Sequence, residues 1–282
     1  MAKVVAAMAM THGPGLTGWF EQAPEGDREL VRGCTKELRR RLEAARPDVL
    51  VMLSNDHLLN WPINNVPNWT VGIADEHVGP ADWFDDWLGL EKFRVKGHPE
   101  LARAIVREGA RRGTMFAYLR RMEFDDGFSV PLHYLNPDMQ VPLVPIGMNC
   151  TLPPIPSSDD VYRLGQVLHE IIRDEWAGEE RVAVIATGGL SHEPGGPRYF
   201  FVDEAFDRWF LELLAEGNHA RIVRECTVAR MEEAGSGGTA ELLAWLAVLP
   251  FTTGGADVLG YTPSTSWRTG TGFVAWPVAS TS

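Results

Sequence analysis

The fold of this chain is decided by the stretch from Val182 to His192, which reads VAVIATGGLSH. Its first five residues are apolar and mostly β-branched or small, which predicts a short buried strand. The pair Gly188-Gly189 then predicts a sharp turn. His192 follows at once, so the sequence predicts an imidazole just beyond the end of a core strand.

Two earlier stretches have the same design. The apolar run from Val4 to Met10 ends in Thr11-His12-Gly13, and the run from Val49 to Leu53 ends in Ser54-Asn55-Asp56-His57. Three histidines therefore follow three candidate core strands. In open α/β sheets the ligand crevice lies at the carboxyl ends of the strands, so this pattern predicts a functional site.

The elements between these strands indicate an α/β fold. A basic amphipathic helix is expected over about 28–46, with Asp27 as its N-cap, and it would join the first two strands as a parallel βαβ unit. Further helices are expected near 99–112, 159–176, 203–216, 218–225 and 240–249, and further strands at 69–74, 141–148, 258–261 and 272–276. With no internal repeat or linker, residues 1–282 are expected to form one catalytic domain. Its central sheet, mostly parallel or mixed, would be flanked by helices, with the active site at the carboxyl ends of the strands.

Composition limits the classes of partner. The formal net charge of −12 argues against nucleic acid and anionic membranes, since both need a basic surface. No apolar run approaches the roughly 20 residues that span a bilayer, and residues 4–10 lack a signal-peptide cleavage site. The three cysteines are widely spaced without a CxxC pattern, which is typical of reduced thiols. We therefore expect a cytoplasmic protein.

Two imidazoles and one carboxylate form a ligand set that suits non-haem Fe(II) and leaves coordination positions open. His12 and His57 would supply the imidazoles, and Glu241, which follows the glycine-rich turn at 235–239, is the best candidate for the carboxylate. Each residue also has a plainer interpretation. Glu241 could cap a helix, His12 and His57 could be polar turn residues, and His192 could be catalytic or structural.

Taken together, these motifs resemble those of the class III extradiol ring-cleavage dioxygenases, the family of the protocatechuate 4,5-dioxygenase β subunit. The resemblance runs from residue 4 to about residue 275. In order, the matching features are Thr11-His12, Asn55-Asp56-His57, the run at 72–76, Asp125-Asp126-Gly127 with 130–132, the run at 187–192, and Glu241 four residues before Trp245. Each is weak alone, and their shared order and spacing make the match specific.

The resemblance implies that His12, His57 and Glu241 hold Fe(II) and that His192 is the acid–base residue. Asn55 would lie beside the substrate or behind a ligand. The partners would be O2 and a small catechol-type aromatic, with no nucleic acid and no membrane. A homo-oligomer is expected from the frequency of such assemblies, and some relatives carry a small partner subunit.

One position departs from the family pattern. The middle motif usually reads Asp-His-Gly, and this chain has Asp126 in place of the histidine. An aspartate could bind a positively polarised group, which suggests a nitrogen-bearing ring such as an aminophenol or a dihydroxypyridine. Alternatively, His192 suffices for catalysis and Asp126 only supports its loop.

Two other functions compete with ring cleavage. A zinc-dependent hydrolase could use His12, His57 and Glu241 to activate water, and a non-catalytic binding or scaffold relative could share the fold. The remaining histidines are expected to be structural. The tryptophan-rich segment 55–97 is expected to be an irregular loop or lid. Arg198 and Arg268 follow loops and could meet a substrate carboxylate, although arginine is more often an ordinary surface residue.

Overall fold

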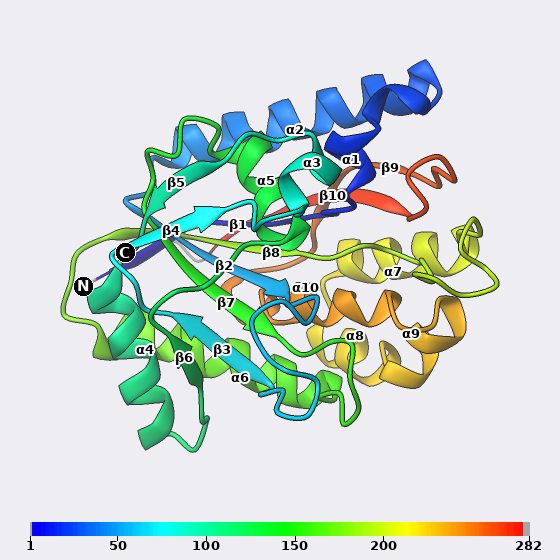
Figure 1. Ribbon diagram of the computed structural model, residues 1–282. Coiled ribbons are helices and arrows are strands. Elements are labelled where there is room, and N and C mark those ends of the chain that lie inside the picture. The colour runs from blue at the N-terminus through cyan, green and yellow to red at the C-terminus, as the bar shows by residue number, and fades with distance from the viewer. Residues whose placement is uncertain (1, 279–282) are drawn as a thin grey trace.

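The computed structural model describes residues 2–278, and its central feature is an eight-stranded mixed sheet (Figure 1). The strand order is β6-β3-β7-β2-β8-β1-β10-β9. The bounds are β1 Lys3–Met10, β2 Val49–Asn55, β3 Trp69–Gly72, β6 Ala117–Leu119, β7 Leu143–Met148, β8 Arg181–Thr187, β9 Asp257–Thr262 and β10 Thr271–Trp276. The four central strands β7, β2, β8 and β1 are parallel. On one side β3 pairs antiparallel with β7 and parallel with the edge strand β6, and on the other side β10 pairs antiparallel with both β1 and β9. The predicted α/β class is confirmed.

The central strands are apolar on both faces because helices cover both sides of the sheet. In β8, Val182, Val184 and Ala186 pack into one core, whereas Ala183 and Ile185 pack into the other. Such continuous apolar runs are typical of buried parallel strands. The periodicity of the sequence therefore located the middle of the sheet.

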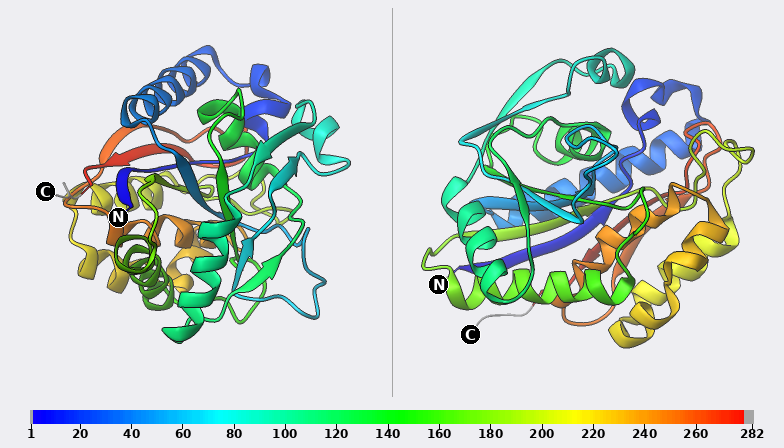
Figure 2. Two further views of the ribbon diagram at one scale, coloured as in Figure 1. Left: turned by 90° about the vertical axis from the view of Figure 1, so that its left-hand side faces the viewer. Right: turned by 60° about the horizontal axis from the view of Figure 1, so that its bottom comes forward.

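Two groups of helices form the outer layers (Figure 2). The first core is covered by α4 (Pro99–Arg111), α6 (Ser158–Glu170), α7 (Glu204–Glu216), α8 (His219–Glu225), α9 (Val228–Ala234) and α10 (Leu243–Leu246). The second core is covered by α2 (Glu25–Ala45), α3 (Phe84–Leu88) and α5 (Asp126–Leu135), with the short α1 (Gly15–Gly18) beside them. In the described range, 2–278, no helix combines the length and the hydropathy needed to cross a bilayer.

Three local predictions were wrong. The helix expected from residue 28 already begins at Glu25, and Asp27 accepts a hydrogen bond from the Thr262 hydroxyl at 2.7 Å and does not cap the helix. The helix expected over 240–249 is broken into a 3-10 turn (Thr239–Leu242), α10 and a second 3-10 turn (Leu249–Phe251). The strand expected at 69–74 is present as β3, but the rest of the segment 55–97 is less irregular than expected, because it also contains α3 and the hairpin of β4 (Glu76–Gly79) and β5 (Phe93–Lys96).

The parallel register brings the three strand-end histidines to one edge of the sheet. Met10 pairs with Thr187, and Leu53 pairs with Ala186. The chain leaves β1, β2 and β8 at the same level, so residues 12, 57 and 192 follow neighbouring strand ends, as predicted.

Candidate active site

His12 is buried, with 2% of its surface exposed, and its tautomer is fixed by β8. The Thr187 hydroxyl donates to the carbonyl of Gly127 at 2.8 Å, so its oxygen must accept the proton on Nδ1 of His12, 3.0 Å away. The lone pair therefore lies on Nε2. That atom is 3.0 Å from Oε2 of Glu241.

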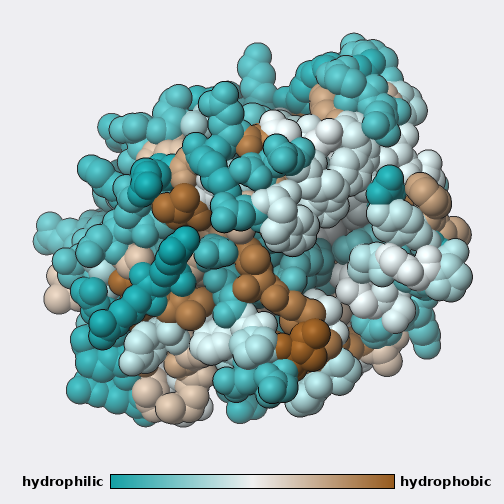
Figure 3. All heavy atoms as spheres, in the orientation of Figure 1, coloured by the Kyte–Doolittle hydropathy of each residue, from teal (hydrophilic) through white to brown (hydrophobic). Residues whose placement is uncertain are grey.

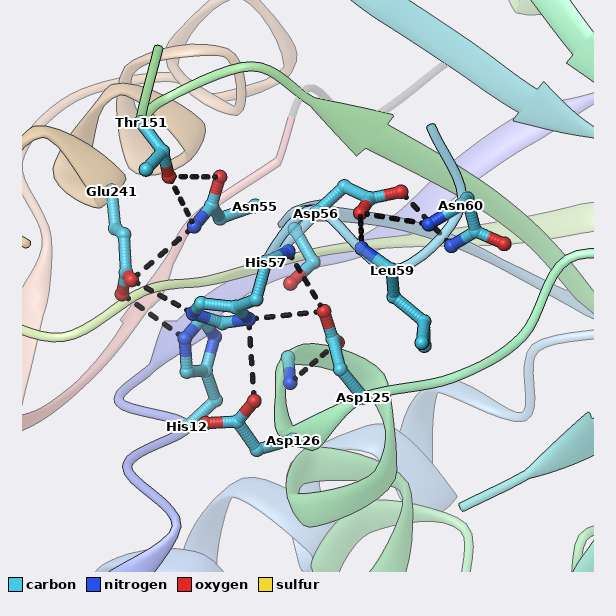
Figure 4. A network of polar contacts seen from close by, with 12 residues as sticks. His12, Asn55, Asp56, His57, Leu59, Asn60, Asp125, Asp126, Thr151 and Glu241 are labelled. Carbon is cyan, nitrogen blue, oxygen red and sulfur yellow. Dashed lines mark hydrogen bonds and ion pairs between the residues drawn. The ribbon is translucent and has the colours of Figure 1, made fainter. Parts of the chain in front are cut away.

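His57 is held in the same way by the turn before α5. Oδ2 of Asp125 accepts both the backbone N–H and the Nδ1–H of His57, each at 3.0 Å, and Oδ1 of Asp126 lies 3.2 Å from Nδ1. The lone pair of His57 is therefore also on Nε2, 3.0 Å from Oε1 of Glu241. Figure 4 shows both rings directed at the same carboxylate.

Glu241 reaches this centre from the 3-10 turn that follows the glycine-rich segment. Its side chain is 3% exposed, and Oε2 accepts the backbone N–H of Gly189 at 2.8 Å. A Cβ on Gly188 would lie 2.7 Å from the carbonyl oxygen of Glu241. The glycine pair after β8 therefore permits close backbone contact with the 3-10 turn that carries Glu241.

His192 lies beside the same carboxylate. Its Nδ1–H donates to the carbonyl of Leu190 at 2.7 Å, and its Nε2 is 3.6 Å from Oε1 of Glu241. A Cβ on Gly238 would come within 2.6 Å of the imidazole. The glycine-rich turn thus makes room for this ring, and Nε2 keeps a free lone pair that can accept a proton.

The geometry favours positive charge at this centre. Nε2 of His12 and Nε2 of His57 each carry a lone pair 3.0 Å from a carboxylate oxygen, and two facing acceptors repel unless a proton or a metal ion lies between them. Asp126 is a further buried carboxylate at this centre. One of its oxygens lies within 4.8 Å of a ring nitrogen of His12 and of a ring nitrogen of His57. The donor set therefore fits a divalent cation.

The pKa values respond to the same accumulation of charge. Burial alone lowers the pKa of His57, but the charges of Asp126 and Asp125 outweigh it and raise that pKa well above its usual value. Burial raises the pKa of Glu241, but His12 and His192 outweigh it and hold that pKa well below its usual value. Burial is the main reason why the pKa of Asp126 is raised. Positive charge is thus favoured among these buried carboxylates.

A cavity of about 300 Å³ opens onto His12, His57, His192, Asp126 and Glu241. Six tryptophan, phenylalanine and tyrosine residues line it, and Figure 3 shows a hollow bordered by residues of intermediate hydropathy. The wall includes Trp19, Trp83, Trp87, Tyr199, Trp267 and Arg268. Of the four tryptophans in 55–97, Trp83 and Trp87 line the cavity, whereas Trp61 donates to Thr70 and Trp69 lies in β3.

Asn55 lies behind Glu241. It is 1% exposed, and its amide nitrogen is 3.4 Å from Oε1 of Glu241 and 3.3 Å from the Thr151 hydroxyl. Asn55 is absent from the cavity lining in the described part of the chain, whereas its partner Thr151 belongs to it. This position matches the alternative in which Asn55 supports a ligand.

Sequence reasoning missed several residues of the site. Asp125 was noted only as part of a motif, and its double contact with His57 was not foreseen. Trp19 and Trp267 were also missed, since they come from loops far apart in sequence. The expected structural histidines, His77, His98, His133, His169 and His219, all lie outside the cavity lining.

The known proteins that this chain resembles are aromatic ring-opening dioxygenases. A family model described as the catalytic LigB subunit of aromatic ring-opening dioxygenase matches residues 6–271. A 2,3-dihydroxyphenylpropionate/2,3-dihydroxicinnamic acid 1,2-dioxygenase of Pseudomonas putida is 29% identical over 196 residues, which are 69% of this chain and 58% of that protein. Gallate dioxygenase of Pseudomonas putida is 32% identical over 155 residues, or 54% of this chain and 45% of that protein. The matched region is thus about half the length of each curated relative.

A solved structure shares the architecture. The uncharacterized protein JW3007 of Escherichia coli K12 superposes with a TM-score of 0.54 at 14% identity, covering 96% of this chain and 99% of that one. At this identity the similarity supports the α/β fold alone.

Proposed function

Because this chain belongs to the family of the catalytic LigB subunit of aromatic ring-opening dioxygenases, we propose that it is a non-haem Fe(II) extradiol dioxygenase. Its substrate would be a catechol-type aromatic, and both atoms of O2 would enter the ring-opened product. The observation that carries this proposal is the pair of Nε2 atoms that lie 3.0 Å from the two oxygens of one buried carboxylate, all lining the same cavity. We take residues 1–282 as one catalytic domain.

His12, His57 and Glu241 would hold the iron. Two neutral imidazoles and one carboxylate are the set typical of non-haem Fe(II) oxygenases, and they leave positions for the two ring oxygens and O2. Iron held there would be chelated by the two ring oxygens of the substrate, and the chemistry it would supply is electron transfer between the ring and O2. The protein residues supply position, proton transfer and a dry cavity.

His192 would be the acid–base residue. Because Nδ1–H is committed to the carbonyl of Leu190, Nε2 can take a proton from a ring hydroxyl and return it later. Asp125 and Thr187 would hold the imidazoles of His57 and His12 in the tautomer that leaves Nε2 free. Asn55 would orient Glu241 through its amide.

Asp126 suggests a nitrogen-bearing ring. Its carboxylate lines the cavity beside His57, at the position where the family pattern has a histidine. A carboxylate there favours an amine or a ring N–H, so we propose an aminophenol or a dihydroxypyridine as the substrate. Steady-state comparison of plain catechols with nitrogen-bearing analogues tests this. A clear preference for plain catechols in the wild type, retained in Asp126→Asn, would show that Asp126 only supports its loop.

We also place the protein in the cytoplasm. Cys34, Cys150 and Cys226 are all unpaired and buried, as expected for a reducing compartment.

The decisive experiment is anaerobic reconstitution with Fe(II), followed by O2 uptake with catechols, aminophenols and dihydroxypyridines. One O2 consumed per ring opened, lost in Glu241→Gln and retained in His133→Gln, would support the proposal; His133 lies on α5 outside the cavity. Stoichiometric zinc in the purified protein, with hydrolysis and no O2 uptake, would favour the hydrolase. Bound iron without O2 uptake on any substrate would favour a non-catalytic relative or a missing partner subunit.

A further inference from the structure

Arg268 lies in the loop between β9 and β10, at the wall of the cavity. The next residue, Thr269, packs close to the histidines: a Cβ on Gly13 would lie 2.8 Å from its methyl group, and a Cβ on Gly189 would lie 2.8 Å from its hydroxyl. The loop that carries Arg268 is therefore in contact with the turns that carry His12 and His192. Among the described lining residues, Arg268 is the only lysine or arginine.

Aromatic rings surround the guanidinium of Arg268. Its Cζ lies 4.9 Å from the ring centre of Trp19, 4.7 Å from that of Tyr199 and 5.4 Å from that of Phe200. Cation–π contacts of this kind hold an arginine in place without neutralising its charge. Nη1 donates to the Tyr199 hydroxyl.

The other edge of the guanidinium has no acceptor. Within residues 2–278, Nε is buried without a hydrogen-bond partner, the one side-chain hydrogen bond of the guanidinium is that of Nη1 to Tyr199, and no carboxylate lies within 4.0 Å of the group. A buried donor without an acceptor is destabilising, because it has lost its hydrogen bonds to water. Nε and Nη2 are the pair of parallel donors with which arginine binds a carboxylate in bidentate fashion.

The backbone at Arg268 is also unusual. Its φ of 63° lies in the left-handed region, which is unfavourable for residues other than glycine. Such strained positions concentrate at ligand-binding sites, where the surrounding structure maintains them. Strain and an unsatisfied charge thus occur at the same residue.

Arg198, the other arginine considered from the sequence, is already committed. Its Nε pairs with Oε2 of Glu193 at 3.0 Å, its Nη2 donates to the carbonyl of Glu233 at 3.0 Å, and it is absent from the described cavity lining. Arg198 therefore has a structural role, and Arg268 is the arginine left free for a ligand.

We propose that Arg268 is a specificity-determining residue that binds a carboxylate carried on the aromatic substrate. This inference rests on the proposed function, since it assumes that the substrate ring lies at His12, His57 and Glu241. Nη2, which is not enclosed, would make the first contact, and Nε would supply the second donor after a small side-chain adjustment. The substrate class is then an aromatic acid whose carboxylate is not one of the groups at the metal centre.

The test compares substrates that differ only in this charge. A carboxylated catechol and its primary amide are assayed with wild type, Arg268→Met and Arg268→Lys. The control is Arg230→Met, because Arg230 also stacks on an aromatic ring, Trp209 at 3.7 Å, but lies outside the cavity. In wild type the acid should exceed the amide at least 10-fold in kcat/KM. Arg268→Met should bring this ratio close to 1, mainly by raising KM for the acid, and Arg268→Lys should lower it less. Arg230→Met should leave the ratio unchanged.

A second measurement separates this inference from the proposed function. Aryl carboxylates without ring hydroxyls cannot be cleaved, and in the metal-free protein their carboxylate has no metal ion to bind. Their binding to metal-free protein, followed by the fluorescence of the cavity tryptophans, therefore tests the Arg268 contact separately from the metal centre. Binding that is lost in Arg268→Met would support the inference even if no substrate were turned over. Ring cleavage with an acid-to-amide ratio that does not respond to Arg268→Met, or aryl carboxylates that bind neither protein, would overturn the inference and leave the proposed function standing.

Discussion

Replacing Asp125 with asparagine changes one atom on the side of His57 that faces away from Glu241. In the native protein Oδ2 of Asp125 accepts two N–H groups of His57, and Oδ1 accepts the backbone N–H of Gly127 at 2.9 Å. Asparagine can keep the bond to Gly127, so the start of α5 is expected to remain. Its NH2 group, however, would face the Nδ1–H of His57, and two donors cannot bond to each other.

The expected response is a change of tautomer. His57 would move its proton from Nδ1 to Nε2, the atom proposed to bind iron, so each iron-binding event would first have to reverse that change. Loss of such an outer partner typically weakens metal binding 10- to 100-fold, which corresponds to about 1.4–2.8 kcal/mol. Asp125→Asn should therefore raise the Kd for Fe(II) by this factor.

Anaerobic Fe(II) titration in competition with a chelator measures this effect. The matched control is Asp56→Asn, because the Asp56 carboxylate accepts from Leu59 and Asn60, whereas the polar contacts of the His57 ring in the described chain are with Asp125, Asp126 and Glu241. The control should change the Kd less than about threefold, since charges without direct contact interact weakly. Equal weakening in both variants would show that bulk negative charge matters and the hydrogen bond does not. An unchanged Kd in Asp125→Asn would refute the assigned tautomer.

Three further predictions concern catalysis and stability. His192→Gln should lower kcat about 10²- to 10⁴-fold with iron affinity nearly intact, and parallel loss of iron in the same titration would contradict its role as acid–base residue. Burial lowers the pKa of His77 to about 4, so between pH 6.5 and pH 4 the unfolded chain binds a proton that the folded chain does not. The free energy of unfolding should therefore fall by about 3 kcal/mol from pH 6.5 to pH 4. Urea unfolding of wild type and His77→Leu at both pH values checks this, and an identical pH dependence of the two proteins would count against it. Asp207 accepts hydrogen bonds from the N–H and hydroxyl of Ser191 and from the Tyr261 hydroxyl. Asp207→Asn should therefore lower the free energy of unfolding, measured in urea, by about 1–3 kcal/mol. No change would mean that asparagine satisfies the same donors.

The sequence alone determined the middle of the sheet and the positions that follow it. A continuous apolar run in a strand places apolar side chains on both faces of the sheet, which is typical of a central strand covered by helices on both sides. For this reason β1, β2 and β8 could be recognised without the structure. Parallel strands end at one edge, and from this fact His12, His57 and His192 were expected to meet. Local rules were less successful where tertiary contacts outweighed them, as at Asp27, whose carboxylate bonds to Thr262 across the fold.

Glu241 is a residue whose role the sequence left open and whose position only the tertiary structure explains. Spacing alone could not separate a ligand from a helix cap, and the resemblance to a family selected the ligand. The structure added the physical reason for its position: the glycine pair after β8 lets the Glu241 backbone approach, and a 3-10 turn replaces the expected helix start. This arrangement depends on the contact between two segments more than 50 residues apart, 188–189 and 241.

The tertiary structure alone decided which charges lack partners. Arg198 and Arg268 were indistinguishable in the sequence, because each follows a loop, and only the folded chain brings Glu193 to one and three aromatic rings to the other. In the same way, Asp125 became the partner of His57 only when the turn before α5 met the end of β2. Apolar periodicity is a local property that a sequence displays directly, whereas the pairing of buried charges depends on distances between segments that only the fold brings together.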